Sequence, residues 1–170
     1  MEAQRPDFGE FYREVKDECL FAVLVSVGDR DTAQDLVAEA FARAWASWPA
    51  VSRHPAPVAW VIRTALNAGV SRWRRRRREV PVPDLALVAD RPAAGGASGD
   101  CVDPGIMAAL LRLPARQRQV VALRLVLDLD TEHTAHVLGI APGTVQAHLG
   151  RAMAALRDDL IPAWQEENKT

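Results

Sequence analysis

The stretch TEHTAHVLGIAPGTVQAHL, residues 131–149, restricts the fold of this chain more than any other part of its sequence. Two short helical patterns meet at Gly139, which lacks a Cβ and so adopts the positive φ of a sharp turn. Ala135 is small enough for two helices to approach closely, and Val145 can hold the second helix against the first. This spacing predicts a helix-turn-helix whose second helix begins near Pro142.

A helix held out in this way fits the major groove of DNA. The residues that it presents outward are Thr144, Gln146, Ala147, His148 and Arg151. The alternative is an ordinary helical hairpin within a core, because helix pairs joined by a glycine turn are common. The motif indicates DNA binding, and the rest of the chain must show how that binding is used.

The whole chain predicts an all-α protein made of two small helical domains joined by a flexible linker, with the helix-turn-helix in the second domain. Apolar residues recur at three- and four-residue steps, and no alternating strand pattern of useful length occurs. Asp31 or Thr32 is expected to cap the second helix, and Trp45 is counted on its apolar face. The expected helices before the helix-turn-helix cover residues 7–27, 32–48, 58–77, 106–113 and 115–127, and the last helix should end near Leu160.

The linker is predicted from composition. Residues 80–106 hold many prolines and glycines and almost no aromatic residue, so they lack the apolar density needed to fold. The expected domains are therefore residues 1–79 and 108–160, separated by a linker at 80–107 and followed by a tail at 161–170.

Charge is segregated along the chain although the net charge is only −1. Residues 72–78, RWRRRRR, carry +6, and residues 110–157 carry six basic and three acidic side chains. The intervening residues 79–109 are acidic. Self-repulsion makes such an arginine run costly unless anions neutralise it, which favours contact with phosphates over a merely solvated charge run.

Other classes of function find little support in the sequence. Cys19 and Cys101 have no metal-binding or redox spacing, and a disulfide between them is not expected in a reducing compartment. His133 and His136 are spaced for a metal but lack a third ligand nearby. With no phosphate-binding loop or nucleophile motif either, the sequence predicts no enzyme, no metal and no cofactor.

Several motifs in succession resemble those of bacterial sigma factors of the extracytoplasmic-function (ECF) group. They are DLVAEAF at residues 35–41, AWV at 59–61 with Asn67 and the arginine run, LPARQR at 113–118, and the helix-turn-helix. The resemblance covers residues 7–78 and 108–157, and the order and spacing of the motifs are more specific than any one of them.

The resemblance implies a subunit that binds core RNA polymerase, through the β′ clamp helices and the β flap, and directs initiation at promoter DNA. The polymerase-binding residues that it implies are Asp35, Leu36, Glu39 and Phe41. The residues implied at the −10 element are Arg53, His54, Trp60, Arg63, Asn67, Arg72, Trp73, Arg74, Arg75 and Arg76. Those implied at the −35 element are Arg116, Arg118, Thr144, Gln146, His148 and Arg151.

Where this sequence has Gln146 and His148, the family usually has basic residues, which should weaken the salt dependence of −35 binding. Gln146 suits adenine through a bidentate contact. An anti-sigma factor is a further partner that the resemblance implies.

Two other interpretations concern partner and compartment. A stand-alone helix-turn-helix regulator would explain the second domain but would leave the first domain and the arginine run without a role. The sequence contains no run of about 18 apolar residues, and its first residues, MEAQRPDFGEF, are polar and acidic, unlike a signal peptide. We therefore expect no membrane insertion and a cytoplasmic protein.

Overall fold

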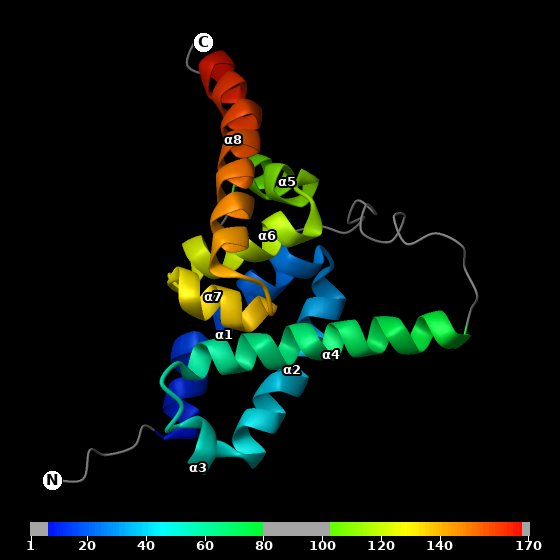
Figure 1. Ribbon diagram of the computed structural model, residues 1–170, viewed down its shortest axis with the longest axis vertical. Coiled ribbons are helices and arrows are strands. Elements are labelled where there is room, and N and C mark those ends of the chain that lie inside the picture. The colour runs from blue at the N-terminus through cyan, green and yellow to red at the C-terminus, as the bar shows by residue number, and fades with distance from the viewer. Residues whose placement is uncertain (1–6, 80–102, 168–170) are drawn as a thin grey trace, which may run out of the picture.

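The computed structural model describes residues 7–79 and 103–167, and these ranges are helical without any strand. The first range contains α1 (Phe8–Val27), α2 (Arg30–Ala46), α3 (Trp48–Val51) and α4 (Pro57–Glu79). The second contains α5 (Pro104–Arg112), α6 (Ala115–Val121), η1 (Ala122–Val126), α7 (Thr131–Leu138) and α8 (Pro142–Glu167) (Figure 1). The all-α prediction is confirmed. Among the described helices, none combines the length and the apolar character that crossing a bilayer requires.

Several helix boundaries differ from those expected. Asp29, rather than Asp31 or Thr32, caps α2, because its carboxylate accepts a hydrogen bond from the backbone N–H of Thr32 at 2.8 Å. The helix expected to run to residue 127 leaves the α form after Val121 and continues as one wider turn, η1. At the other end of the domain, α8 does not stop near Leu160 but runs on to Glu167.

The expected linker is shorter at its C-terminal end than the composition suggested. Asp103 caps α5 by accepting hydrogen bonds from the backbone N–H groups of Gly105, at 2.7 Å, and Ile106, at 3.2 Å. Pro104 occupies the first turn, where its missing N–H leaves no bond unmade. Residues 80–102, including Cys101, lie outside the described part of the chain.

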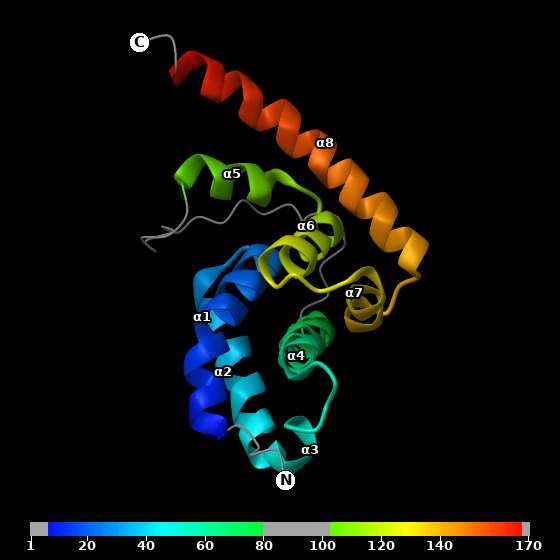
Figure 2. The ribbon, with the colours of Figure 1, turned by 90° about the vertical axis from the view of Figure 1, so that its left-hand side faces the viewer.

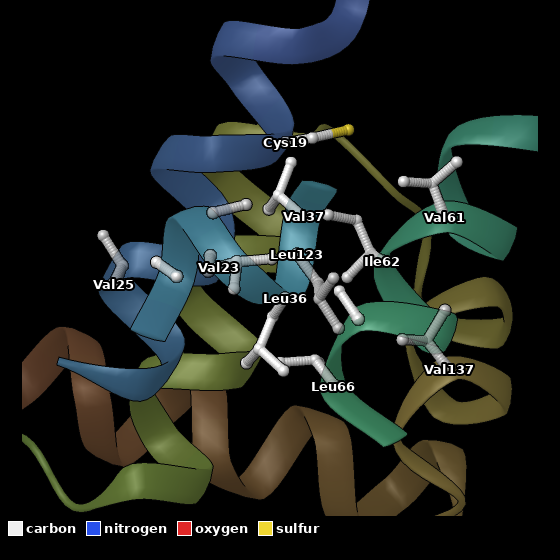
Figure 3. Packing of buried hydrophobic residues seen from close by; sticks show 14 of the residues in the cluster. Cys19, Val23, Val25, Leu36, Val37, Val61, Ile62, Leu66, Leu123 and Val137 are labelled. Carbon is white, nitrogen blue, oxygen red and sulfur yellow. The ribbon is translucent and has the colours of Figure 1, made fainter. Parts of the chain in front are cut away.

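The first three long helices pack around a core of aliphatic side chains (Figure 3). Leu36 of α2 is fully buried between α1 and α4, and Ile62 and Leu66 of α4 close the cluster from the other side. A Cβ on Gly69 would lie 3.1 Å from Cδ1 of Leu36, so the absence of a side chain there lets α2 and α4 approach closely.

The second group of helices packs directly on the first and does not stand apart from it. Leu123 of η1 and Val137 of α7 belong to the same buried cluster as Val23 and Leu66 (Figure 3). Figure 2 shows α6 over α1 and α7 beside α4. The described chain is therefore closed, with one continuous apolar core joining its two halves.

Candidate nucleic-acid interface

The predicted helix-turn-helix is present. α7 ends at Leu138 and is capped by Gly139, whose φ of 64° is left-handed, and the N–H of Ile140 donates to the carbonyl oxygen of Ala135 at 3.1 Å. Val145 is fully buried against Ala135 and Val120, so α6 supports the two helices of the motif from behind. The angle between α7 and α8 is thus set by a small apolar cluster of its own.

The first turns of α8 carry most of the predicted −35 residues on an open face. Thr144, Gln146 and Arg151 are exposed, and Nε2 of Gln146 donates to Oγ1 of Thr131 at 2.9 Å. His148 is only partly exposed, and its Nδ1 is buried with no hydrogen-bond partner among the described residues. The face therefore offers one amide, one hydroxyl and one guanidinium without obstruction.

The two arginines of the LPARQR segment have different environments. Arg116 is exposed, and its Nη1 donates to Oε1 of Gln119 at 3.1 Å. Arg118 is only 8% exposed and donates to the carbonyl oxygens of Leu111, at 3.1 Å, and Leu113, at 2.8 Å. The expectation that Arg118 contacts the −35 element does not fit this burial. It satisfies carbonyls at the end of α5, which Pro114 prevents from continuing.

α4 presents part of the predicted −10 surface. Arg63 and Asn67 are exposed one turn apart, while Trp60 and Trp73 are half-buried, and Trp60 packs against the core. In the loop before α4, Arg53 is exposed, and Nδ1 of His54 accepts a hydrogen bond from the N–H of Ala56 at 3.0 Å.

The arginine run begins with a residue that is already paired. Nη2 of Arg72 lies 3.0 Å from a carboxylate oxygen of Glu39, and Nη1 lies 3.5 Å from one of Asp35. Arg74 and Arg75 are exposed, whereas the side chains from Arg76 onward lie outside the described residues. In the closed chain, Arg72 joins the basic end of α4 to α2.

The DLVAEAF segment separates into surface and core. Asp35 is exposed and Glu39 is partly exposed, one turn apart, and Glu39 also pairs with Arg43 at 2.5 Å. Leu36 and Phe41 are buried, so they shape α2 from within and present little surface to a polymerase in this structure. This placement differs from the contact role expected of these two residues.

An exposed apolar surface that the sequence did not predict lies beside α2. Trp45, counted on the buried face of α2, is 68% exposed. It borders a shallow apolar hollow of about 210 Å³ lined by Phe8, Tyr12, Phe41 and Ala42. Trp45 follows the buried Phe41 by four residues, which favours the apolar face, but it lies nine residues, or two and a half turns, after the buried Leu36. That half-turn offset and its place in the last turn of α2 are signals in the sequence that Trp45 lies at the edge of the apolar face.

The residues considered for metal or redox chemistry are otherwise engaged. Nδ1 of His133 lies 2.7 Å from a carboxylate oxygen of Asp130, and His136 contacts Arg63. No cluster of three metal-ligating side chains occurs among the described residues. Burial raises the pKa of the Cys19 thiol to about 12, so this thiol stays protonated and unreactive.

Comparison with known proteins gives two family matches that together cover both halves. Residues 11–79 match the model for sigma-70 region 2, and residues 105–156 match that for sigma-70 region 4. The RNA polymerase sigma-E factor of Streptomyces coelicolor is 33% identical over 156 residues, which cover 91% of this chain and 86% of that protein.

Two further relatives agree with these matches. The ECF RNA polymerase sigma factor EcfG of Rhodopseudomonas palustris is 31% identical over 136 residues, covering 80% of this chain and 75% of EcfG. The sigma factor RpoE of Bartonella quintana, solved in complex with the anti-sigma factor NepR, has a similar fold with a TM-score of 0.74 and 25% identity. That alignment covers 91% of this chain and 96% of RpoE.

Proposed function

The chain belongs to the ECF group of the sigma-70 family, and from this premise we propose how its surfaces serve transcription initiation. It binds core RNA polymerase, reads the −10 and −35 promoter elements, and works by binding rather than by catalysis. The sigma-factor relatives support this function and give no support to a stand-alone regulator. Its place of action is the cytoplasm, where the polymerase and the promoter are.

The exposed side of α2 is the polymerase-binding surface in this proposal. Asp35 and Glu39 offer two carboxylates one turn apart, and the exposed Trp45 adds an apolar contact at the end of the same helix. A partner with basic and apolar groups at matching positions would satisfy both features, because exposed aromatic side chains are frequent anchors of interfaces. Leu36 and Phe41 support this surface from the core.

α4 and the loop before it form the −10 surface. Arg53, Arg63 and Asn67 are exposed there, and the arginine run supplies positive charge for backbone phosphates. Trp60 and Trp73 keep part of their rings accessible, and stacking on an unpaired base is the contact that such rings offer. The exposed beginning of α8 forms the −35 surface, with Arg116 beside it.

The single observation that carries the proposal is that two helices with exposed basic and amide side chains, α4 and α8, belong to separate helical groups of one chain. Elements centred at −10 and −35 are about 25 base pairs apart, or roughly 85 Å along a duplex. α4 and α7 are in direct contact, so the closed chain cannot reach both elements at once. Promoter binding therefore requires the two groups to separate.

Separation exposes the apolar surface around Leu123 and Val137, which opposes opening in the free chain. Contacts with polymerase would offset this cost, so DNA binding should depend on polymerase. An anti-sigma factor would act by holding the closed form or by covering α2. The complex of the similar RpoE with NepR supports the existence of such a partner.

The test is transcription with purified components. The full chain is mixed with bacterial core polymerase and a library of promoter fragments, and transcripts are sequenced from their 5′ ends. Specific start sites that appear only when both proteins are present are the expected result. The proposal is wrong if the chain has no affinity for the core enzyme, or if it selects the same DNA sites equally well without it.

A further inference from the structure

Thr131, at the start of α7, makes a contact that its own helix does not require. Capping of α7 is carried out by Asp130, whose carboxylate oxygens accept from the backbone N–H of His133 at 2.7 Å and contact its ring Nδ1 at 2.7 Å. The hydroxyl of Thr131 is directed instead to α8, where Oγ1 accepts from Nε2 of Gln146 at 2.9 Å.

The two residues are held at this distance by the packing behind them. Val145, next to Gln146, is fully buried against Ala135 of α7 and Val120 of α6. The turn at Gly139 is closed by the hydrogen bond from Ile140 to Ala135. Because interiors packed in this way do not deform continuously, the beginning of α7 and the second turn of α8 keep their relative positions.

The bond to Thr131 uses only part of the hydrogen-bonding capacity of Gln146. A primary amide has two N–H donors and one carbonyl oxygen. The bond to Thr131 takes one N–H, which leaves the second N–H and Oε1 of this exposed side chain for other partners. That pair of groups is the one that a glutamine uses toward N7 and N6 of adenine in the major groove.

We propose that Thr131 is a positioning residue that orients the amide of Gln146 for reading one adenine of the −35 element. This inference rests on the proposed −35 role of α8. A free glutamine side chain loses considerable rotamer freedom when it binds. Thr131 restricts the side chain before DNA arrives, so less freedom is lost at recognition. The base itself is contacted by Gln146 alone.

The experiment uses the full chain bound to core polymerase. The preferred −35 sequence is first selected from duplexes randomised over that element, and single-base variants of the winner then compete for binding. The wild-type holoenzyme should prefer adenine at one position by about tenfold. Gln146→Ala should remove that preference and leave the other positions unchanged.

The decisive pair of variants is Thr131→Val, which keeps the shape but loses the hydroxyl, and Thr131→Ser, which keeps the hydroxyl. Valine should lower the adenine preference by about fivefold, while serine should retain it. Because Thr131 lies in the first turn of α7, Thr131→Ala serves as a second variant and should behave as valine does. The salt dependence of binding should be the same for all three, since no phosphate contact is altered.

The inference is overturned if Thr131→Val and Thr131→Ala keep the full adenine preference, or if Gln146→Ala changes no base preference. The specific transcript made by the wild-type holoenzyme is measured in the same reactions. Its presence shows that the proposed function stands even where the role of Thr131 fails.

Discussion

Nη1 of Arg63 and Nε2 of His136 lie 2.6 Å apart and join α4 to α7 across the boundary between the two halves of the chain. Because an arginine side chain only donates, the imidazole nitrogen is the acceptor in this contact. Arg63 is one of the residues expected to contact the −10 element. The closed chain therefore uses a side chain that we propose for −10 contact to hold the half that carries the proposed −35 surface.

Removing this contact should loosen the closed form. Arg63→Ala should raise the ratio of open to closed molecules by about fivefold, because a typical intramolecular hydrogen bond contributes on the order of 1 kcal/mol. The measurement is energy transfer between dyes on cysteines placed at Ala46 and Ala154, with Cys101 replaced by serine. His136→Gln, which keeps an acceptor, should stay closed. An unchanged distance distribution in Arg63→Ala would show that apolar packing alone closes the chain.

Alanine variants of Arg72 and Arg74 form a matched pair that tests whether the ion pairs of Arg72 contribute to stability. Arg72→Ala should lower the free energy of unfolding by about 0.5 kcal/mol, because it removes partly exposed ion pairs with Glu39 and Asp35. Arg74→Ala should leave the free energy of unfolding unchanged, since Arg74 is exposed. Urea titrations measure the difference. Equal stability of the two variants would mean that the ion pairs contribute nothing.

Replacing Arg74–Arg77 together with alanine should abolish promoter opening and leave polymerase binding intact. The change removes four positive charges from the end of α4 without touching the exposed carboxylates of α2. Permanganate reactivity of unpaired thymines reports opening, and co-purification with core polymerase reports binding. Opening that persists at physiological salt would show that the arginine run does not hold the melted promoter.

Leu36→Ala should destabilise the chain by about 3 kcal/mol, because it leaves a cavity between α1, α2 and α4. Its exposed neighbour supplies the control: Asp35→Ala should alter the free energy of unfolding by less than about 0.5 kcal/mol. At a temperature where both variants are folded, only Asp35→Ala should weaken polymerase binding. If a folded Leu36→Ala variant lost polymerase affinity, Leu36 would have to be counted among the residues that contact polymerase.

Lowering the pH should weaken the N-terminal caps of two helices, α2 and α7. Hydrogen bonds from the Thr32 hydroxyl and N–H lower the pKa of Asp29, and those from the N–H and ring of His133 lower that of Asp130, from 3.8. A lowered folded-state pKa contributes stability that is complete above the ordinary value and is lost as the pH falls through the folded-state value. The double variant Asp29→Asn and Asp130→Asn keeps capping side chains but cannot titrate.

Urea midpoints measured at several pH values on both sides of 3.8 should therefore fall more steeply for the wild type than for the asparagine variant. Parallel curves would show that other carboxylates dominate acid unfolding. Well above that pH, where both aspartates are ionised, the two proteins should differ little.

The sequence predicted what depends on local spacing. Gly139, Ala135 and Val145 have the roles expected, because a tight turn and a close helix contact each require a particular residue type at a fixed distance along the chain. Asp29 is not singled out as the cap by the sequence, because Asp29, Asp31 and Thr32 all lie within four residues and sequence does not rank them.

What depends on tertiary packing could not be predicted in the same way. Three- and four-residue steps lead along α2 from Leu36 to Trp45, but they do not show how far around the helix its neighbours reach: Leu36 is buried, and Trp45, half a turn further round, is exposed. From sequence alone Arg118 is expected at the surface. The structure shows it buried, because it donates hydrogen bonds to carbonyl oxygens at the end of α5. The contact between α4 and α7 joins residues far apart in sequence, and no local sequence pattern predicts it.

The burial of Cys19 has a practical consequence for studying how the molecule opens. Cys19 is fully buried in the apolar cluster to which both halves contribute, so alkylating reagents reach its sulfur only when that cluster opens. The rate at which a thiol reagent modifies Cys19 therefore reports how often the closed chain opens. Partners that hold the two halves together should lower this modification rate, and partners that separate the halves should raise it.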